Sequence, residues 1–147
     1  MKFDHIGVVT RSLEKGRKVL EATVGVHEWT RTWDDPVNGV FIQFGRDASG
    51  VCYELLVPNG PDSPVQEALS TRKAILNHVA YLVDDLDAAA ARLLDGGCAP
   101  AGPPKPAIAY GGKRIQFFVT PLWLIVELVE APGHEHVYDW SGAEASA

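Results

Sequence analysis

The sequence predicts an α+β fold built from two tandem copies of one βαβββ module, and three observations support this prediction. An internal repeat aligns the two halves of the chain at a constant offset of 73 residues. Within each half, a strand pattern, a helix pattern and further strand patterns follow in the same order. The length of 147 residues, 46% of them hydrophobic, is typical of one domain with a real core.

The repeat is gapless, and it includes polar residues. His5 and His78 begin the two copies, and Glu54 and Glu127 follow them after the same interval of 49 residues. The other matched pairs are Leu13 with Leu86, Leu20 with Leu93, Gly39 with Gly112, Ile42 with Ile115, Gln43 with Gln116, Phe44 with Phe117, and Leu55 with Leu128. Because histidine and glutamate bind metals, the repeat bears on function as well as on fold.

Each half begins with a strand and continues with a helix. Residues 3–9 and 76–83 are short and rich in β-branched residues, which favours strands. Residues 12–23 and 85–96 place leucine and alanine at helical intervals, which predicts amphipathic helices. The pair Gly96-Gly97 indicates the end of the second helix.

The rest of each half consists of stretches with glycine, proline or asparagine and apolar runs of strand length. These runs are residues 40–45 and 51–57 in the first half, and 114–119 and 122–130 in the second. A short helix over about 64–72 is predicted between the halves, with Ser63 as its cap, Pro64 in the first turn and Gln66 completing a capping box.

These elements predict one domain over residues 1–131. Module one covers about 1–60, the connecting helix lies within about 62–73, and module two covers about 74–131. Residues 132–147 lose the periodic pattern and form a C-terminal tail.

Composition excludes several classes of function. The net charge is −6, and no basic cluster interleaves with aromatic residues, so we expect no nucleic-acid partner. No apolar run reaches membrane-spanning length, and the first residues lack the pattern of a secretory signal. Cys52 and Cys98 form neither a CxxC pair nor a disulfide framework. We therefore expect a cytoplasmic protein that does not contact membranes.

Strand alternation places the repeated polar residues on apolar faces. His5 shares its face with Phe3 and Val9, and Glu54 shares its face with Cys52 and Leu56. A carboxylate on such a face is costly to desolvate unless it is paired or bound to a cation. Alone, each residue is most simply structural, and the repeat itself is open to a second interpretation, in which it only preserves the fold of a metal-free binding protein.

Two histidines and two glutamates at symmetric positions supply the nitrogen and oxygen donors that suit Zn²⁺, Co²⁺, Ni²⁺, Mn²⁺ or Fe²⁺. The sequence therefore predicts that four residues bind one divalent ion: His5, Glu54, His78 and Glu127.

Other candidates are weaker. Gln43 and Gln116 either face a cavity or simply pack within their strands. His27, His134 and His136 have no symmetric counterparts and are most simply surface residues, although the pair near the tail is placed to cap a pocket. Cys52 shares the face of Glu54, but a free cysteine is most often a small buried residue.

Four stretches of the chain resemble the vicinal oxygen chelate superfamily (glyoxalase, bleomycin resistance, dioxygenase), and within it the methylmalonyl-CoA epimerase-like branch. They are DHIGVVTRSLEKG, YELLVPNGPDSPVQEAL, LNHVAYLVDDLDAAAARL and LIVELVE, spread over residues 3–131. The resemblance implies a glyoxalase-like fold, in which paired βαβββ modules form a cupped mixed sheet around a metal, and it maps the ligands onto the same four residues. It also implies a homodimer.

The chain departs from the epimerase pattern at three places. Tyr110-Gly111-Gly112 replaces a His-Gly pair, and residues 119–123 replace a His-Pro-Lys turn. Gln43 lies in the strand where some epimerases carry a non-ligand glutamate, and an amide cannot act as a second base.

The predicted activity is metal-dependent proton abstraction α to a carbonyl, by an epimerase, isomerase or lyase. The substrate is a small acyl thioester, carried by CoA or a carrier protein, or a 2-oxo compound. Glu127 is assigned as ligand and acid/base, with Glu54 as the alternative. Two other functions stay open: an Fe(II) dioxygenase, which a fourth protein ligand disfavours, and a metal-free protein that sequesters a small molecule such as an antibiotic.

Overall fold

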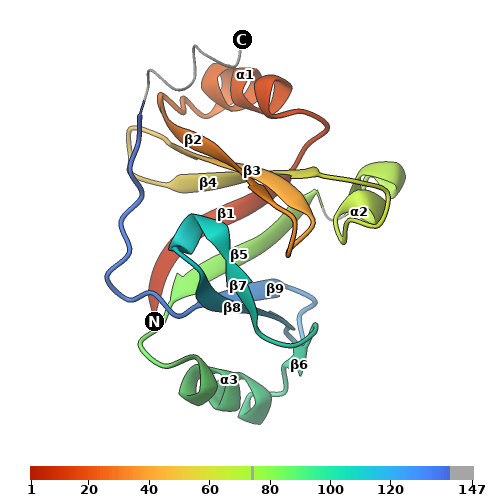
Figure 1. Cartoon of the computed structure of the whole chain (residues 1–147), viewed down its shortest axis with the longest axis vertical. Coiled ribbons are helices and arrows are strands. Elements are labelled where there is room, and N and C mark those ends of the chain that lie inside the picture. The colour runs from red at the N-terminus through yellow and green to blue at the C-terminus, as the bar shows by residue number, and fades with distance from the viewer. Residues whose placement is uncertain (74, 140–147) are drawn as a thin grey trace. The chain divides into compact units, whose positions relative to one another are not determined.

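The computed structural model describes residues 1–73 and 75–139 (Figure 1). The part of the predicted tail after residue 139 therefore lies outside the described residues. The elements follow the chain as β1 (Lys2–Val9), α1 (Leu13–Thr23), β2 (Glu28–Asp35), β3 (Val40–Arg46), β4 (Cys52–Pro58), α2 (Gln66–Thr71), β5 (Leu76–Leu82), α3 (Leu86–Asp95), β6 (Ala99–Pro100), β7 (Lys105–Ala107), the 3₁₀ turn η1 (Ile108–Tyr110), β8 (Lys113–Val119) and β9 (Ile125–Val129).

The chain divides into two compact units, which we name after their helices. The α1 unit consists of Ile6–Asn77 and Glu135–Ala147, and the α3 unit consists of Met1–His5 and His78–His134. The strands β1 and β5 therefore contribute residues to both units. The proposed boundaries of a single domain over residues 1–131 stay a prediction.

In the α1 unit the strands are ordered β2-β3-β4-β1. The pairs β2/β3 and β3/β4 are antiparallel, whereas β1/β4 is parallel, so the sheet is mixed. Its core contains Trp29 and Leu55, against which Leu20 of α1 packs. A Cβ atom at Gly16 would lie 2.9 Å from Leu55 Cδ1, so glycine allows the helix to approach the sheet closely.

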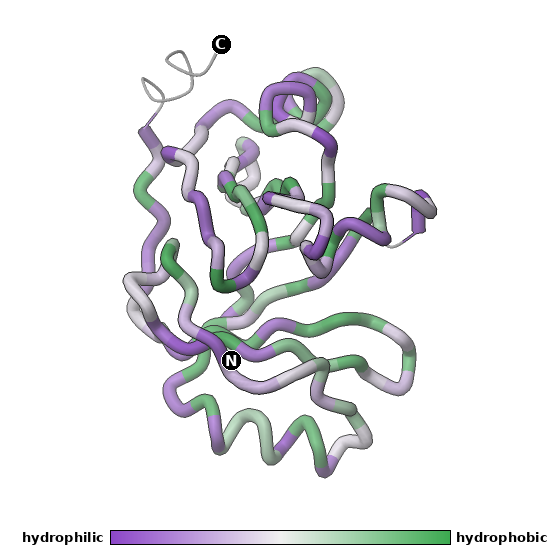
Figure 2. The backbone as a smooth tube through the Cα atoms, turned by 45° about the vertical axis from the view of Figure 1, so that its right-hand side comes forward, coloured by the Kyte–Doolittle hydropathy of each residue, from purple (hydrophilic) through white to green (hydrophobic). Residues whose placement is uncertain are grey.

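In the α3 unit the order is β5-β9-β8-β6, and β7 also pairs with β8. The pair β5/β9 is parallel and β8/β9 is antiparallel. Leu86 and Ala89 of α3 pack against Phe118 and Leu128 of the sheet. Figure 2 shows both hydrophobic and hydrophilic residues along α3, as expected for a helix with one buried face.

The two predicted helices in the modules are confirmed, with ends that follow from capping. The Ser12 hydroxyl accepts a hydrogen bond from the Lys15 N–H, and the Asp85 carboxylate accepts one from the Ala88 N–H. Gly96 ends α3, and its N–H donates to the Arg92 carbonyl. The mixed α+β fold that the sequence predicts is thus the observed one.

The predicted cap of the connecting helix is wrong. The helix α2 begins at Gln66, and Val65 precedes it without a side-chain cap. In a capping box the Ser63 hydroxyl would accept a hydrogen bond from the Gln66 N–H. That N–H donates to the Ser63 carbonyl oxygen instead, at 3.0 Å. A turn at residues 63–66 therefore takes the place of the expected first helical turn.

One predicted strand boundary is wrong. The last strand begins at Ile125 rather than at residue 122, because the Trp123 N–H donates to the Thr120 carbonyl and Trp123 has a φ of 64°, which makes the hairpin turn. The βαβββ module requires one more strand than the apolar runs supply, and in the first half this strand is β2, which no run in the sequence predicts. No helix within residues 1–73 and 75–139 is long and apolar enough to cross a membrane.

Candidate metal centre

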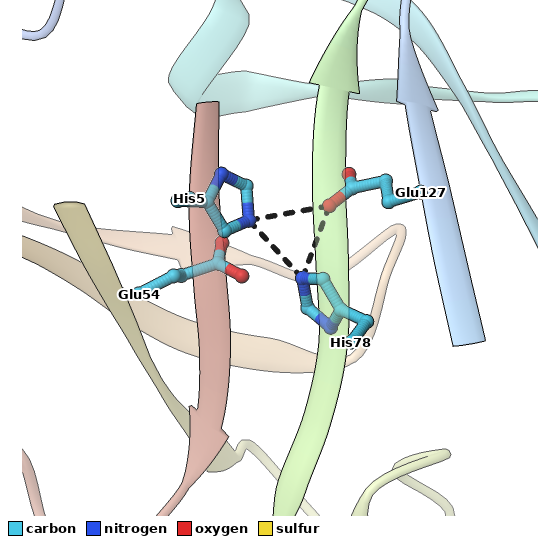
Figure 3. A group of neighbouring side chains, drawn as sticks. All are labelled: His5, Glu54, His78 and Glu127. Atoms are coloured by element: carbon cyan, nitrogen blue, oxygen red, sulfur yellow. Dashed lines mark hydrogen bonds and ion pairs between the residues drawn. The ribbon is translucent and has the colours of Figure 1, made fainter. Parts of the chain in front are cut away.

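Three of the four predicted ligands meet inside the α3 unit (Figure 3). His5 comes from β1, His78 from β5 and Glu127 from β9, and all three side chains are buried. The Nε2 atoms of the two histidines lie 3.1 Å apart. Glu127 Oε2 lies 3.3 Å from His5 Nε2 and 3.1 Å from His78 Nε2. The three donor atoms therefore form a nearly equilateral triangle.

Strand register explains how His78 and Glu127 meet. Glu127 is paired with Ala80 of β5 and with Phe117 of β8. His78 lies two residues before Ala80, so its side chain projects from the same face as Glu127. The His78 ring contacts the Phe117 ring edge-on, at a centroid distance of 5.3 Å. An apolar neighbour and a parallel register thus hold this imidazole beside the carboxylate.

The electrostatics of Glu127 favour an ionised carboxylate. Burial raises the pKa of this carboxyl, but hydrogen bonds from His5 and His78, together with their charges, outweigh burial. The pKa of Glu127 therefore lies below its ordinary value. A buried negative charge between two imidazoles is a site that suits a cation.

The donor triangle also has the dimensions of a metal site. A first-row metal with nitrogen and oxygen ligands at about 2.0–2.2 Å holds adjacent donors about 3 Å apart. The three observed separations, 3.1, 3.1 and 3.3 Å, match this spacing without any rearrangement. The buried histidine and glutamate cluster is thus able to hold a divalent metal.

Glu54 lies in the α1 unit, on β4, where it is also buried. It is paired with Gly7 of β1 and with Phe44 of β3. Gly7 is two residues after His5, just as Ala80, the partner of Glu127, is two residues after His78. The two predicted glutamate ligands therefore occupy the same register in their modules.

The two repeated glutamines do not share the glutamate faces. Gln43 is paired with Leu55 and Gln116 with Leu128, each one residue beyond the glutamate of its strand. The Gln43 amide accepts from Arg17 of α1 at 2.9 Å and donates to the Thr30 carbonyl at 2.7 Å. For Gln43, packing is therefore the observed one of the two interpretations that the sequence leaves open.

The remaining candidates have separate places. His27 is exposed. The His134 ring lies 4.5 Å from the Tyr110 ring in the α3 unit, and the His136 ring lies 4.3 Å from the Phe44 ring in the α1 unit. Cys52 is buried and forms no disulfide. The tail histidines are therefore packed on aromatic rings rather than being plain surface residues.

Sequence reasoning missed two polar neighbours of His5. Asp4 Oδ2 lies 2.8 Å from His5 Nδ1. The Tyr110 hydroxyl donates to the same Asp4 oxygen at 2.7 Å and lies 3.1 Å from His5 Nδ1. The signal available for Asp4 was its position next to a predicted ligand, but nothing local linked it to Tyr110, which is 106 residues away.

Comparisons with known proteins identify the family of this chain. The family model described as the glyoxalase/bleomycin resistance protein/dioxygenase superfamily matches residues 4–117. The ethylmalonyl-CoA/methylmalonyl-CoA epimerase of Cereibacter sphaeroides is 31% identical over 121 residues, which cover 79% of this chain and 86% of that protein. An uncharacterised Bacillus subtilis protein, YqjC, is 30% identical over 92% of this chain and 96% of its own length.

Solved structures give the same result. A methylmalonyl-CoA epimerase in complex with methylmalonyl-CoA and NH₄⁺ is 27% identical, with a TM-score of 0.72 over 92% of this chain and 98% of that one. A variant of the Streptomyces coelicolor methylmalonyl-CoA epimerase in complex with 2-nitronate-propionyl-CoA is 27% identical, with a TM-score of 0.73 over 93% and 99% of the two chains. The chain therefore has a glyoxalase-like fold and belongs to the glyoxalase/bleomycin resistance/dioxygenase superfamily, in its methylmalonyl-CoA epimerase-like branch.

Proposed function

We propose that the protein is a divalent-metal-dependent enzyme that abstracts a proton α to the carbonyl of a small acyl thioester, as an epimerase does. The observation that carries this proposal is the buried triangle of His5 Nε2, His78 Nε2 and Glu127 Oε2. Two imidazoles and one carboxylate at metal-ligand spacing, in a chain related to acyl-CoA epimerases, favour this chemistry over simple ligand storage.

Glu54 is the proposed fourth ligand. The matched register supports this. Glu54 is paired with the residue two positions after His5, and Glu127 is paired with the residue two positions after His78. Burial supports it as well, since Glu54 is only 6% exposed and a buried carboxylate favours a cationic partner. In this proposal each module contributes one histidine and one glutamate to a single ion.

When bound, a divalent metal would polarise the thioester carbonyl and stabilise the negative charge that develops on its oxygen. His5 and His78 anchor the site and direct their Nε2 lone pairs toward it. Glu127 is the proposed acid/base that takes the α-proton, because it is ionised and belongs to the donor set. Glu54 is the alternative acid/base. Gln43 takes no part, because its amide lies on the opposite face of the sheet.

The proposed substrate class follows from the relatives. One solved relative holds methylmalonyl-CoA, and another holds 2-nitronate-propionyl-CoA. Both are CoA thioesters of short acyl groups, and the Cereibacter sphaeroides relative bears the name of two such substrates. A short branched acyl-CoA with an acidic α-carbon is therefore the first compound to test, followed by carrier-bound thioesters and 2-oxo compounds.

One observation favours a second candidate, an Fe(II) dioxygenase. Two histidines and one carboxylate, the set that meets in the α3 unit, are also the ligands of non-haem Fe(II) oxygenases. Glu54 separates the two candidates, because a fourth protein ligand would fill a position that oxygen needs. Oxygen consumption by the Fe(II)-loaded protein would favour the dioxygenase and contradict the epimerase proposal.

Deuterium exchange tests the first proposal. Protein loaded with Co²⁺ or Zn²⁺ is incubated in D₂O with methylmalonyl-CoA, and mass spectrometry follows incorporation at the α-carbon, with EDTA-treated protein as the control. The proposal expects one deuterium per acyl group, with exchange dependent on the metal. If neither the short acyl-CoA substrates nor the 2-oxo compounds exchange with the loaded protein, that result contradicts proton abstraction and favours the sequestration or oxygen-dependent alternatives.

The homodimer that the resemblance implies is also proposed. A small chain with exposed sheet edges is commonly covered by a second copy. Sedimentation velocity at micromolar concentration should show a dimer, and a monomer throughout that range would contradict it.

A further inference from the structure

The Nδ1 side of His5 faces two polar residues that the sequence repeat does not reproduce. Asp4 Oδ2 receives two donors, the His5 Nδ1–H at 2.8 Å and the Tyr110 hydroxyl at 2.7 Å. The Asp4 side chain is 6% exposed and that of His5 is fully buried. All three residues belong to the α3 unit. They form a compact polar cluster behind the imidazole, on the side away from Glu127.

Neither Asp4 nor Tyr110 is matched by the same residue type in the other module. At the offset of 73 residues, the position that matches Asp4 is Asn77, a neutral amide, and the position that matches Tyr110 is Val37, an exposed apolar residue. The Asp4 and Tyr110 pair is therefore specific to the His5 half of the repeat, although the Nε2 atoms of both histidines belong to the same donor triangle.

The fold holds Tyr110 in place for this contact. Tyr110 ends the 3₁₀ turn η1 and is 5% exposed. Gly111 and Gly112 follow with φ values of 64° and 80°, a left-handed conformation that glycine adopts without strain. The Gly111 N–H donates to the Ile108 carbonyl, and the Gly112 N–H donates to the Ala107 carbonyl. This closed turn directs the phenol inward, toward Asp4.

We propose that Asp4 and Tyr110 are positioning residues that orient His5 as an imidazole ligand. This inference rests on the proposed metal site. A carboxylate that accepts from Nδ1–H fixes the tautomer in which Nε2 carries the lone pair, and it increases the basicity of the imidazole. Tyr110 acts through Asp4, because its hydroxyl fixes the oxygen that the imidazole donates to. Tyr110 thereby becomes part of the metal centre of this chain without being a ligand.

Cobalt binding to the full-length protein tests the inference. The visible d–d absorption of Co²⁺ is titrated against wild type and against Asp4→Asn, which is nearly isosteric and gives module one the Asn-His pair of module two. We expect Asp4→Asn to weaken Co²⁺ binding by about 10–100-fold, the usual effect of losing such a partner. The matched control is Asp87→Asn, because Asp87 is an exposed carboxylate of the same unit, and its affinity should equal that of wild type.

Tyr110→Phe separates positioning from general stability. The phenyl ring keeps the packing against His134, so only the hydroxyl is lost. We expect weaker Co²⁺ binding than in wild type but tighter than in Asp4→Asn. The double variant should bind no more weakly than Asp4→Asn alone, since Tyr110 acts only through that carboxylate.

The outcomes are distinct. Wild type that binds Co²⁺, with folded Asp4→Asn or Tyr110→Phe variants that bind within about twofold of it, would overturn this inference and leave the proposed function standing. Additive losses in the double variant would overturn the assignment of Tyr110. Wild type that binds no Co²⁺ would overturn the proposed function, and this inference with it. If Asp4→Asn fails to fold by far-ultraviolet circular dichroism, Tyr110→Phe decides.

Discussion

The two modules place their large core residue at different positions of the repeat. In module one, Trp29 of β2 is paired with Gly45 of β3, and a Cβ atom at Gly45 would lie 2.5 Å from Trp29 Cζ3. At the offset of 73 residues, the matching residues are Gly102 and Phe118, although Phe118 is paired with Pro100 of β6. Phe118 is 1% exposed and packs against α3. Along the sequence repeat, the bulky residue and the glycine have thus exchanged places.

The polar residues on the helix-facing sides differ as well. Gln43 is fully buried and connects Arg17 of α1 to the Thr30 carbonyl. Its counterpart Gln116 is partly exposed, and its amide nitrogen donates to the Gly102 carbonyl at 3.0 Å. One glutamine is part of a core, whereas the other closes a loop.

The sheet faces that carry Glu54 and Glu127 are alike in the two modules, unlike the faces that pack against the helices. There the register of Glu54 against Gly7 equals that of Glu127 against Ala80, with a histidine two residues earlier in each case. A core accepts several packing solutions as long as volume is kept, but a metal accepts few arrangements of donors. The contrast supports the proposed metal site as the constraint that keeps this part of the two modules alike.

The largest expected effect concerns the two glutamates. Glu127→Gln keeps an oxygen donor but removes the base, so α-proton exchange with D₂O should fall by about 10²–10⁴-fold per bound metal. Glu54→Gln should lower metal content while exchange per bound metal is retained. The control is Glu67→Gln, at an exposed carboxylate on α2. Full metal and full exchange in Glu127→Gln would transfer the acid/base role to Glu54.

The two large core residues come next. Trp29→Ala and Phe118→Ala should each lower the free energy of unfolding by about 3–5 kcal/mol, because each removes a ring that is at most 1% exposed. Urea unfolding measures both. Similar losses would show that the exchanged positions are equivalent, whereas a loss below about 1 kcal/mol at either position would show that its module tolerates the cavity.

The glycine that packs against Trp29 can be tested in the same way, by adding a single methyl group at Gly45. Gly45→Ala should destabilise by about 1–3 kcal/mol, because the new Cβ meets the Trp29 ring. Gly60→Ala is the matched control, since a Cβ there meets nothing within 4 Å. In the Trp29→Val background the Gly45→Ala penalty should shrink. An equal penalty in both backgrounds would assign the overpacking to Val26, whose Cγ1 lies 2.7 Å from the same Cβ position, instead of to Trp29.

The smallest effect separates the two glutamines. Gln43→Leu removes the acceptor of Arg17 and the donor to Thr30, so it should cost about 1–3 kcal/mol in urea unfolding. Gln116→Leu should change stability by no more than about 0.5 kcal/mol. Equal losses at both positions would contradict the view that only module one uses its glutamine as a core residue.

The sequence predicted what depends on period and offset. Alternation and helical spacing located β1, α1, β5 and α3, and the repeat identified the histidines and glutamates as matched pairs. It could not choose a face for Gln43, because period two assigns faces only after the register with the neighbouring strand is known. It also missed β2, whose charged residues and tryptophans give no clean apolar alternation.

The sequence also could not predict contacts between segments that are far apart along the chain. Asp4 and Tyr110 meet because η1 and β1 are brought together by the sheet, and no local pattern reports that. Ser63 failed as a cap because a backbone carbonyl, rather than the hydroxyl, accepts the Gln66 N–H, and the competition between these acceptors is decided by the turn geometry.

Anomalous diffraction at the zinc edge, from crystals grown with Zn²⁺, tests directly whether the two modules share one metal ion. The proposed site predicts one peak per chain, with His5 Nε2, His78 Nε2 and oxygens of Glu54 and Glu127 at about 2.0–2.2 Å from it. That result would establish one histidine and one glutamate from each module on a single ion. A peak that lacks the histidine or the glutamate of either module, or a well-ordered crystal with no peak at these residues, would contradict it.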